Sequence, residues 1–134
     1  MADDRNFDLS IITPDRVFYE GSAYMVEVNT TEGEVGIYKD HIPMTFILKP
    51  GILTIYEDAE TKEAALHAGF VEVLGDRITI MAEIVEWPSE IDEGRAQAAM
   101  DRAKERIAQK DSATDYARAE TALARAIARI EVLK

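Results

Sequence analysis

The chain of 134 residues has no cysteine, two histidines and a formal net charge of −11. This length predicts one domain, or one compact domain with a small appendage. The composition excludes disulfide scaffolds, iron–sulfur clusters, thiol nucleophiles and three-histidine metal centres. No apolar run approaches the roughly 18–20 residues of a membrane-spanning helix, and the first ten residues lack the layout of a signal peptide. We therefore expect a soluble intracellular protein.

The charge is distributed unevenly along the chain. Residues 1–90 hold 6 Lys and Arg against 18 Asp and Glu, whereas residues 91–134 hold 9 against 8. An acidic surface repels nucleic acid and anionic membranes, so neither is an expected partner. The second part is also rich in alanine, with 12 among its 44 residues. These contrasts predict two modules that meet near Trp87 and Pro88.

The first module has the pattern of an antiparallel β-sandwich. Phe7, Leu9 and Ile11 alternate with neighbours at the two-residue period of a half-buried strand. The alternation returns in the runs 23–30, 51–57, 65–74 and 76–83. Turn signals such as Pro50-Gly51 and Gly75-Asp76 separate these runs. Short strands at this spacing are typical of a sandwich or a flattened barrel.

The second module is predicted to be a helical hairpin. Ser89 follows a proline and is a candidate N-cap, and apolar residues continue from Ile91 at helical spacing. The stretch 109–112 interrupts this spacing, and Asp111 or Ser112 is a candidate cap for a second helix. The predicted apolar face of that helix consists of Tyr116, Ala119, Leu123, Ile127 and Ile130. A short connection between two helices makes them antiparallel neighbours.

The alanine content of the hairpin has an energetic consequence. Alanine is the best helix former, so both helices form readily, but its small side chain buries little surface. We therefore expect the hairpin to dock weakly on the sandwich. Two interpretations follow: a mobile regulatory element or a static helical appendage.

Arginines recur with the same spacing on both predicted helices. Arg95, Arg102 and Arg106 stand at i, i+7 and i+11, which places them in one narrow stripe. Arg118, Arg125 and Arg129 repeat this spacing on the second helix. Such rows form a solvated face, a contact for an acidic protein surface, or a site for polyphosphate.

Three segments resemble one known family in the same order along the whole chain. The stretch TEGEVGIYKDHIPMTFILKPG (31–51) closely resembles the signature loop of the ε subunit of F-type ATP synthases. Residues 67–83 resemble the next hairpin of that family, and residues 115–130 resemble its C-terminal helix. The departures are small: Lys39-Asp40 stands where Pro and a small residue are common, and Ala68 where a second Gly is usual.

The resemblance implies a non-catalytic rotor subunit on the cytoplasmic side of the cell membrane, peripheral to it. Residues 1–88 would form a sandwich of about ten strands that joins the γ subunit to the c-ring. Residues 89–134 would form a hairpin that folds against the sandwich, or extends along γ and inhibits ATP hydrolysis. The implied γ and c-ring contacts are Glu32, Glu34, Tyr38 and His41. The implied contacts to an acidic segment of the catalytic β subunit are Arg102, Arg106 and Arg118.

The resemblance also implies a regulatory ligand, although no cofactor is required. Some bacterial members bind ATP through an Ile/Leu-Asp-x-x-Arg-Ala motif, which residues 91–96 match in full. The implied ATP-binding residues are Glu86, Ile91, Asp92, Arg95, Ala96, Arg125 and Arg129.

Other functions receive less support from the residues. A free-standing ATP-sensing module is the main alternative, and it would not co-purify with a γ-type subunit. Glu32, Glu34, Asp40 and His41 are predicted to share one loop, but one histidine among turn carboxylates favours rotor contact over acid–base or metal chemistry. A hydrolase is disfavoured because no nucleophile–base constellation is present. His67 is expected to be structural.

Overall fold

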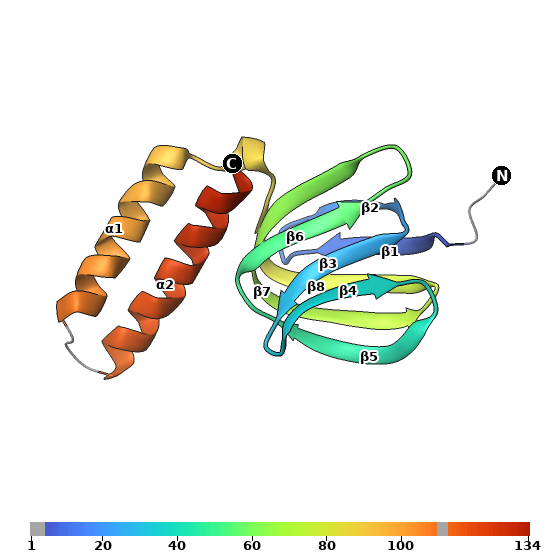
Figure 1. Cartoon of the computed structure of the whole chain (residues 1–134), viewed down its shortest axis with the longest axis horizontal. Coiled ribbons are helices and arrows are strands. Elements are labelled where there is room, and N and C mark those ends of the chain that lie inside the picture. The colour runs from blue at the N-terminus through green and yellow to red at the C-terminus, as the bar shows by residue number, and fades with distance from the viewer. Residues whose placement is uncertain (1–4, 110–112) are drawn as a thin grey trace.

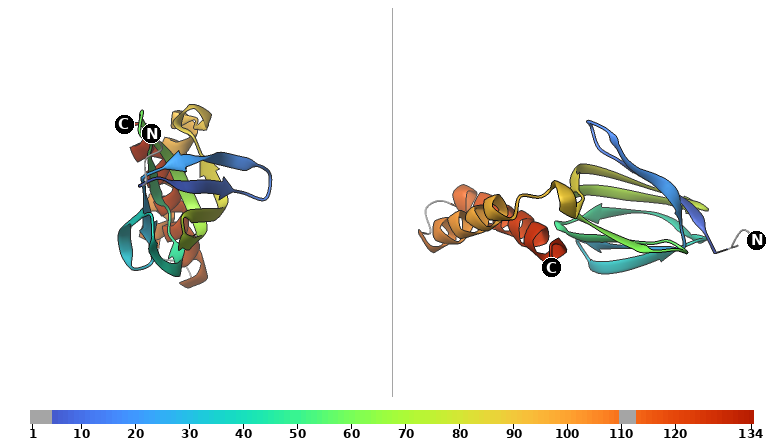
Figure 2. Two further views of the ribbon diagram at one scale, coloured as in Figure 1. Left: turned by 90° about the vertical axis from the view of Figure 1, so that its right-hand side faces the viewer. Right: turned by 90° about the horizontal axis from the view of Figure 1, so that it is seen from above.

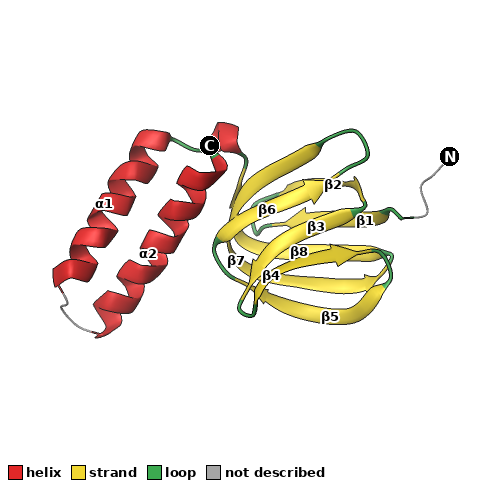
Figure 3. Ribbon diagram, viewed as in Figure 1, coloured by secondary structure: helices red, strands yellow, loops and turns green. Residues whose placement is uncertain are grey.

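A computed structural model describes residues 5–109 and 113–134 as a β-sandwich followed by two helices (Figure 1). The elements are β1 (Phe7–Ile12), β2 (Val17–Ala23), β3 (Met25–Thr30), β4 (Gly33–Tyr38), β5 (His41–Leu48), β6 (Gly51–Tyr56), β7 (Thr61–Gly75), β8 (Arg77–Glu86), the 3₁₀ turn η1 (Pro88–Glu90), α1 (Glu93–Gln109) and α2 (Ala113–Val132). Figure 3 shows the same separation of strands from helices. The predicted sandwich and helical hairpin are therefore confirmed. The expected caps at Asp111 and Ser112 lie outside the described residues.

The strands form one continuous hydrogen-bonded sheet that folds over itself. Its order is β2-β1-β8-β7-β5-β3-β4, and β6 pairs with β3 and β7. The described residues contain eight strands rather than about ten, because the long strands β7 and β8 bend at bulges without breaking. The β1–β8 pair is parallel, whereas the other pairs are antiparallel. β1 is the first strand of the sandwich in the sequence and β8 is the last. No tight turn joins them, so they need not be antiparallel.

The predicted alternation accounts for the core of the sandwich. Phe7, Leu9 and Ile11 are buried on one side of β1, and their neighbours Asp8 and Ile12 are exposed. The largest fully buried apolar side chains from the other strands are Ile37, Leu53, Ile55, Ile78, Ile80, Val26, Val28, Val71 and Val73. Since each contributes roughly 1.5–3 kcal/mol on burial, the sandwich has its own core without the helices.

The hairpin projects from one end of the sandwich, as the view from above shows (Figure 2). α2 packs on β6 and β7, and α1 packs on α2. The fully or nearly fully buried residues between the helices are alanines: Ala96, Ala103, Ala119 and Ala126. Tyr116 and Ile127, predicted on the apolar face of α2, are instead exposed. The reason is that two helices with alanines between them approach closely. α1 then covers only a narrow stripe of α2, and the apolar side chains beside this stripe stay exposed.

A small apolar cluster joins the hairpin to the sandwich. Its buried members are Ala65 of β7 with Ala128 and Val132 of α2, and Ile52, Ile91 and Leu133 pack around them. Two of the three buried side chains are alanine, so this contact contributes on the order of a few kcal/mol. The small size of the cluster supports the prediction that the hairpin docks weakly.

The connection between the modules is fixed to the sandwich. The Trp87 ring stacks on Phe18 with ring centroids 4.3 Å apart. Arg16 Nη1 lies 2.8 Å from Glu90 Oε2, and Glu90 Oε1 accepts a hydrogen bond from the Trp87 backbone N–H at 2.8 Å. Ser89 lies inside η1 and does not cap α1, so that prediction was wrong. The proline before Ser89 starts the separate 3₁₀ turn, and α1 begins only after Asp92.

No described helix is long and apolar enough to cross a membrane.

Candidate functional site

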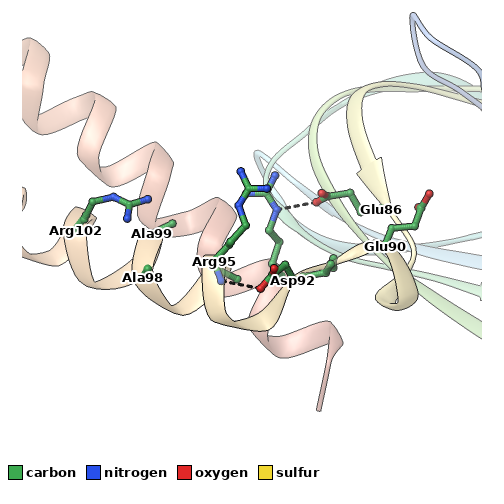
Figure 4. Close-up of a pocket in the computed structure, with 10 residues that line it drawn as sticks. Glu86, Glu90, Asp92, Arg95, Ala98, Ala99 and Arg102 are labelled. Carbon is green, nitrogen blue, oxygen red and sulfur yellow. Dashed lines mark hydrogen bonds and ion pairs between the residues drawn. The ribbon is translucent and has the colours of Figure 1, made fainter.

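An open pocket of about 390 Å³ lies where the sandwich, the junction and both helices meet (Figure 4). Glu86 and Glu90 line it from β8 and η1, Arg95 and Arg102 from α1, and Arg129 from α2. Ala96, Ala98 and Ala99 also line the pocket, and their short side chains leave room beside α1. The volume falls in the usual range of small-molecule sites, about 300–1,000 Å³, and the charged lining suits a charged ligand.

Glu86 connects the sandwich to α2 at the wall of this pocket. Its Oε1 atom accepts a hydrogen bond from Arg129 Nε at 2.7 Å. The same oxygen lies 2.9 Å from Nε2 of His67, a buried side chain of β7. Burial alone would raise the pKa of Glu86, but the bonds from Arg129 and His67 lower it below its usual value. Glu86 is therefore a carboxylate at neutral pH.

Asp92 has two roles in the structure: it caps the start of α1, and it lines the pocket. Its Oδ1 atom accepts a hydrogen bond from the backbone N–H of Arg95 at 3.0 Å, as an N-cap residue does. Its backbone carbonyl accepts the first helical bond, from the N–H of Ala96 at 3.0 Å. The cap fixes the start of α1, and with it the position of Arg95 over the pocket.

The arginines of α1 provide the positive side of the pocket. Arg95 and Arg102 rise from the same side of the helix, two turns apart (Figure 4). Neither guanidinium forms an ion pair with a carboxylate within residues 5–109 and 113–134, whereas Arg129 is paired with Glu86. Two such arginines on one side of a helix are suited to binding an anion, because guanidinium groups donate bidentate hydrogen bonds to phosphate or carboxylate oxygens.

The structure brings together six of the seven residues predicted to bind ATP. Glu86, Ile91, Asp92, Arg95, Ala96 and Arg129 all line the pocket. Arg125 lies outside it, with Nη2 at 3.9 Å from Glu83 Oε2. Arg125 and Arg118 line a separate shallow depression on α2.

Arg102 and Glu90 line the pocket but are not among the predicted ATP-binding residues. Arg102 was assigned only to the acidic partner surface, together with the exposed Arg106 and Arg118. Its distance of seven residues from Arg95 is the signal that would have placed it in the pocket, because i and i+7 share a helix face. Glu90 had no such signal, because its position depends on η1.

The residues predicted to contact γ and the c-ring lie at two ends of the sandwich. Glu32 and Glu34 flank the start of β4, Tyr38 is its last residue, and His41 begins β5. The six residues of β4 span roughly 20 Å at about 3.3 Å per residue. The prediction that Glu32, Glu34, Asp40 and His41 share one loop is therefore wrong. Glu34 lies instead beside the hairpin, in a cleft with Ile127 and Glu131 of α2.

Apolar side chains form a row across the outer face of the sandwich. Ile47, Phe70, Met81 and Ile12 are direct neighbours in register across β5, β7, β8 and β1. Their exposed fractions are 62%, 40%, 41% and 38%. We name these four residues the apolar row. A contiguous exposed apolar surface of this kind marks a contact site for another protein.

Comparison with known proteins identifies related chains for both modules. Residues 6–88 match the family described as "ATP synthase, Delta/Epsilon chain, beta-sandwich domain". Residues 89–134 match "ATP synthase, Delta/Epsilon chain, long alpha-helix domain". The first match ends at Pro88 and the second begins at Ser89.

Bacterial relatives and solved structures extend this likeness over nearly the whole chain. An ATP synthase epsilon chain of Caldanaerobacter subterraneus subsp. tengcongensis is 48% identical over 96% of this chain and 94% of its own. An ATP synthase epsilon chain of Shouchella clausii is 44% identical over 94% of this chain and 93% of its own. A chain in the mitochondrial ATP synthase structure of Euglena gracilis has the same fold, with a TM-score of 0.85 at 20% identity over 96% of this chain and 82% of that one.

Proposed function

The chain belongs to the delta/epsilon-chain family of ATP synthases, and we propose that it couples the γ subunit to the c-ring of an F-type enzyme through its sandwich. The subunit is non-catalytic. In this proposal the hairpin regulates ATP hydrolysis, and ATP bound in the pocket holds it in the docked position. In this proposal the chain is a peripheral subunit at the cytoplasmic side of the cell membrane.

One observation carries the regulatory part of the proposal: the sandwich and both helices of the docked hairpin together line the pocket. Its wall combines Glu86 of the sandwich, Arg95 of α1 and Arg129 of α2. A ligand that contacts all three binds only the docked form, and therefore stabilises that form by mass action. Because docking itself contributes only a few kcal/mol, ligand binding at 100 times Kd, worth about 2.7 kcal/mol, is large enough to shift the balance.

ATP is the ligand that fits the two sides of the pocket. Arg95 and Arg102 provide guanidinium groups for phosphate oxygens, and Glu86 and Asp92 provide carboxylate oxygens that accept hydrogen bonds from a ribose or a base. Contact of Arg125 with phosphate would require its 3.9 Å pair with Glu83 to open.

The apolar row favours a subunit over a free-standing sensor. In a free-standing sensor, four exposed apolar side chains aligned across adjacent strands would stay in contact with water. In a subunit of a complex, they would be buried against a neighbouring protein. In the undocked hairpin, the arginine stripes would be available to an acidic segment of the catalytic β subunit. Arg106 and Arg118 are exposed and suit this contact.

Calorimetric titration of the full chain with ATP tests the nucleotide site. Arg95→Ala should weaken binding about ten- to a hundredfold, because a charge-assisted hydrogen bond contributes about 1.5–3 kcal/mol. Lys104→Ala is the matched control: it removes one positive charge from an exposed position of α1 that does not line the pocket. We expect this control to bind like the wild type. Equal affinities for the two variants would contradict the proposed site, and so would no wild-type binding at millimolar ATP.

A further inference from the structure

We propose that His67 is a positioning residue of this pocket: its neutral ring, protonated at Nε2, holds the Glu86 carboxylate in place, so that ligand binding weakens in acid. The inference rests on the nucleotide site proposed above. It concerns a side chain of the sandwich that does not line the pocket and is outside the predicted ATP motif.

His67 lies at a β-bulge of β7, on the same face as Ala65, which packs against the hairpin. In the β7–β8 ladder Leu66 pairs with Val85 and Ala68 with Ile84, so His67 is the extra residue between two paired positions. Bulges of this kind re-aim a side chain. Next to it, Gly69 has φ +149°, and a Cβ there would lie 2.1 Å from the Met81 carbonyl oxygen, so the distorted backbone depends on glycine. The His67 side chain is 1% exposed, which leaves its ring no contact with bulk water.

The hydrogen bonds around the ring favour one neutral tautomer. Nε2 lies 2.9 Å from Glu86 Oε1, which accepts, so this nitrogen carries the proton. Nδ1 is buried and has no hydrogen-bond partner among the described residues. Without a proton, Nδ1 is only an acceptor, so no buried N–H group is left without a partner. A second proton would make it a buried donor without an acceptor, on a ring that carries a charge.

The charged groups that face the ring oppose its protonation on balance. They are Glu86 of β8, which favours the charged ring, and Arg129 and Arg125 of α2, which oppose it. On the other side of β7, β6 pairs here through Gly51 and Ile52, which are uncharged. Burial is the largest effect and lowers the pKa of His67 below its usual value, and the two arginines lower it further against the opposing effect of Glu86.

The direction of the pH effect follows from this pKa. A histidine whose pKa is lowered in the docked form favours docking while it is neutral, above its ordinary pKa of about 6.5. That contribution is lost as the pH falls toward the lowered value. Undocking of α2 removes Arg129 and Arg125 from the ring, so protonation favours the undocked hairpin. Acid should therefore weaken ligand binding and docking together.

Two variants of the full chain separate positioning from simple packing. In His67→Gln the side-chain amide nitrogen replaces the Nε2 donor but does not titrate. This variant should bind ATP with wild-type affinity at pH 7.5. His67→Ala removes the donor, and should bind about tenfold more weakly.

The pH profiles of the wild type and His67→Gln provide the decisive comparison, because the titration of ATP itself affects both equally. Between pH 7.5 and 5 the wild type should lose up to about tenfold more affinity than His67→Gln. Identical profiles would overturn the inference, and so would equal binding by His67→Ala and the wild type at pH 7.5. A wild-type chain that fails to bind ATP at all would overturn the nucleotide site and, with it, the ligand part of this inference.

Nitrogen-15 NMR of the ligand-free chain tests the tautomer without any nucleotide. We expect His67 protonated at Nε2 at neutral pH, with a titration midpoint below about 6.5. Protonation at Nδ1, or a midpoint at or above that value, would overturn the role of His67 even if ATP binds as proposed.

Discussion

Ala128→Glu should undock the hairpin while both helices and the sandwich stay folded. Ala128 is 4% exposed and packs with Ala65 and Val132 in the cluster that joins the two modules. A glutamate there has to displace the neighbouring strand or take its carboxylate out of water. Overpacking alone costs about 1–3 kcal/mol. A loss of about 2 kcal/mol reduces the ratio of docked to undocked chains roughly thirtyfold.

Ala117→Glu is the matched control for this experiment, because it makes the same change at an exposed position of α2. Alanine and glutamate are both good helix formers, so neither variant should lose helix content by circular dichroism. Amide hydrogen exchange of the full chain measures the outcome. In Ala128→Glu the surface of β6 and β7 that faces α2 should exchange faster, with the inner strands unchanged. Exchange equal to that of the control, or loss of protection throughout the sandwich, would refute the idea of a weakly docked, separable hairpin.

Three further substitutions test the fold and the partner surface. Gly69→Ala should destabilise the chain by more than about 2 kcal/mol in denaturant unfolding, because its Cβ would lie 2.1 Å from a backbone oxygen at φ +149°; stability within error of the wild type would contradict this bulge. Gly94→Ala should stabilise α1 by about 0.5–1 kcal/mol, measured by thermal unfolding, since its added Cβ meets only an ordinary contact at 3.4 Å. Phe70→Glu should change stability little but weaken pull-down of the γ subunit at least tenfold, and undiminished capture would rule out the apolar row as the contact.

The alternation of apolar residues was sufficient to predict the sandwich, but it could not predict every pairing. Strands such as β1 bury every second residue, so their sequence carries a local signal. The parallel pairing of β1 with β8 joins residues about 70 positions apart and leaves no local pattern. The prediction of a loop is wrong for β4, because this strand contains two glycines and buries only Ile37, which leaves no alternation to detect.

The pocket could be predicted in part, because a motif fixes residues that are close in sequence. Residues 91–96 surround the start of α1, so their shared position follows from helix geometry. Arg102 shares a helix face with Arg95, and its i, i+7 spacing is a usable signal, but its place at the pocket also depends on how the hairpin docks. Glu90 depends on η1, for which the sequence contains no pattern. His67 appeared structural because a lone histidine on a strand usually is. Its contact with Glu86 depends on the register of β7 against β8, which the alternation within one strand cannot reveal.

The central claim, that the hairpin restrains ATP hydrolysis and ATP releases this restraint, is tested most directly in the assembled enzyme. Removal of residues 91–134 leaves Trp87 and Glu90 in place against Phe18 and Arg16, so the sandwich should fold and assemble. The account predicts faster ATP hydrolysis than in the intact enzyme at low ATP, a difference that narrows as ATP rises, and largely unchanged ATP synthesis. Equal hydrolysis rates with and without these residues at low ATP would contradict it.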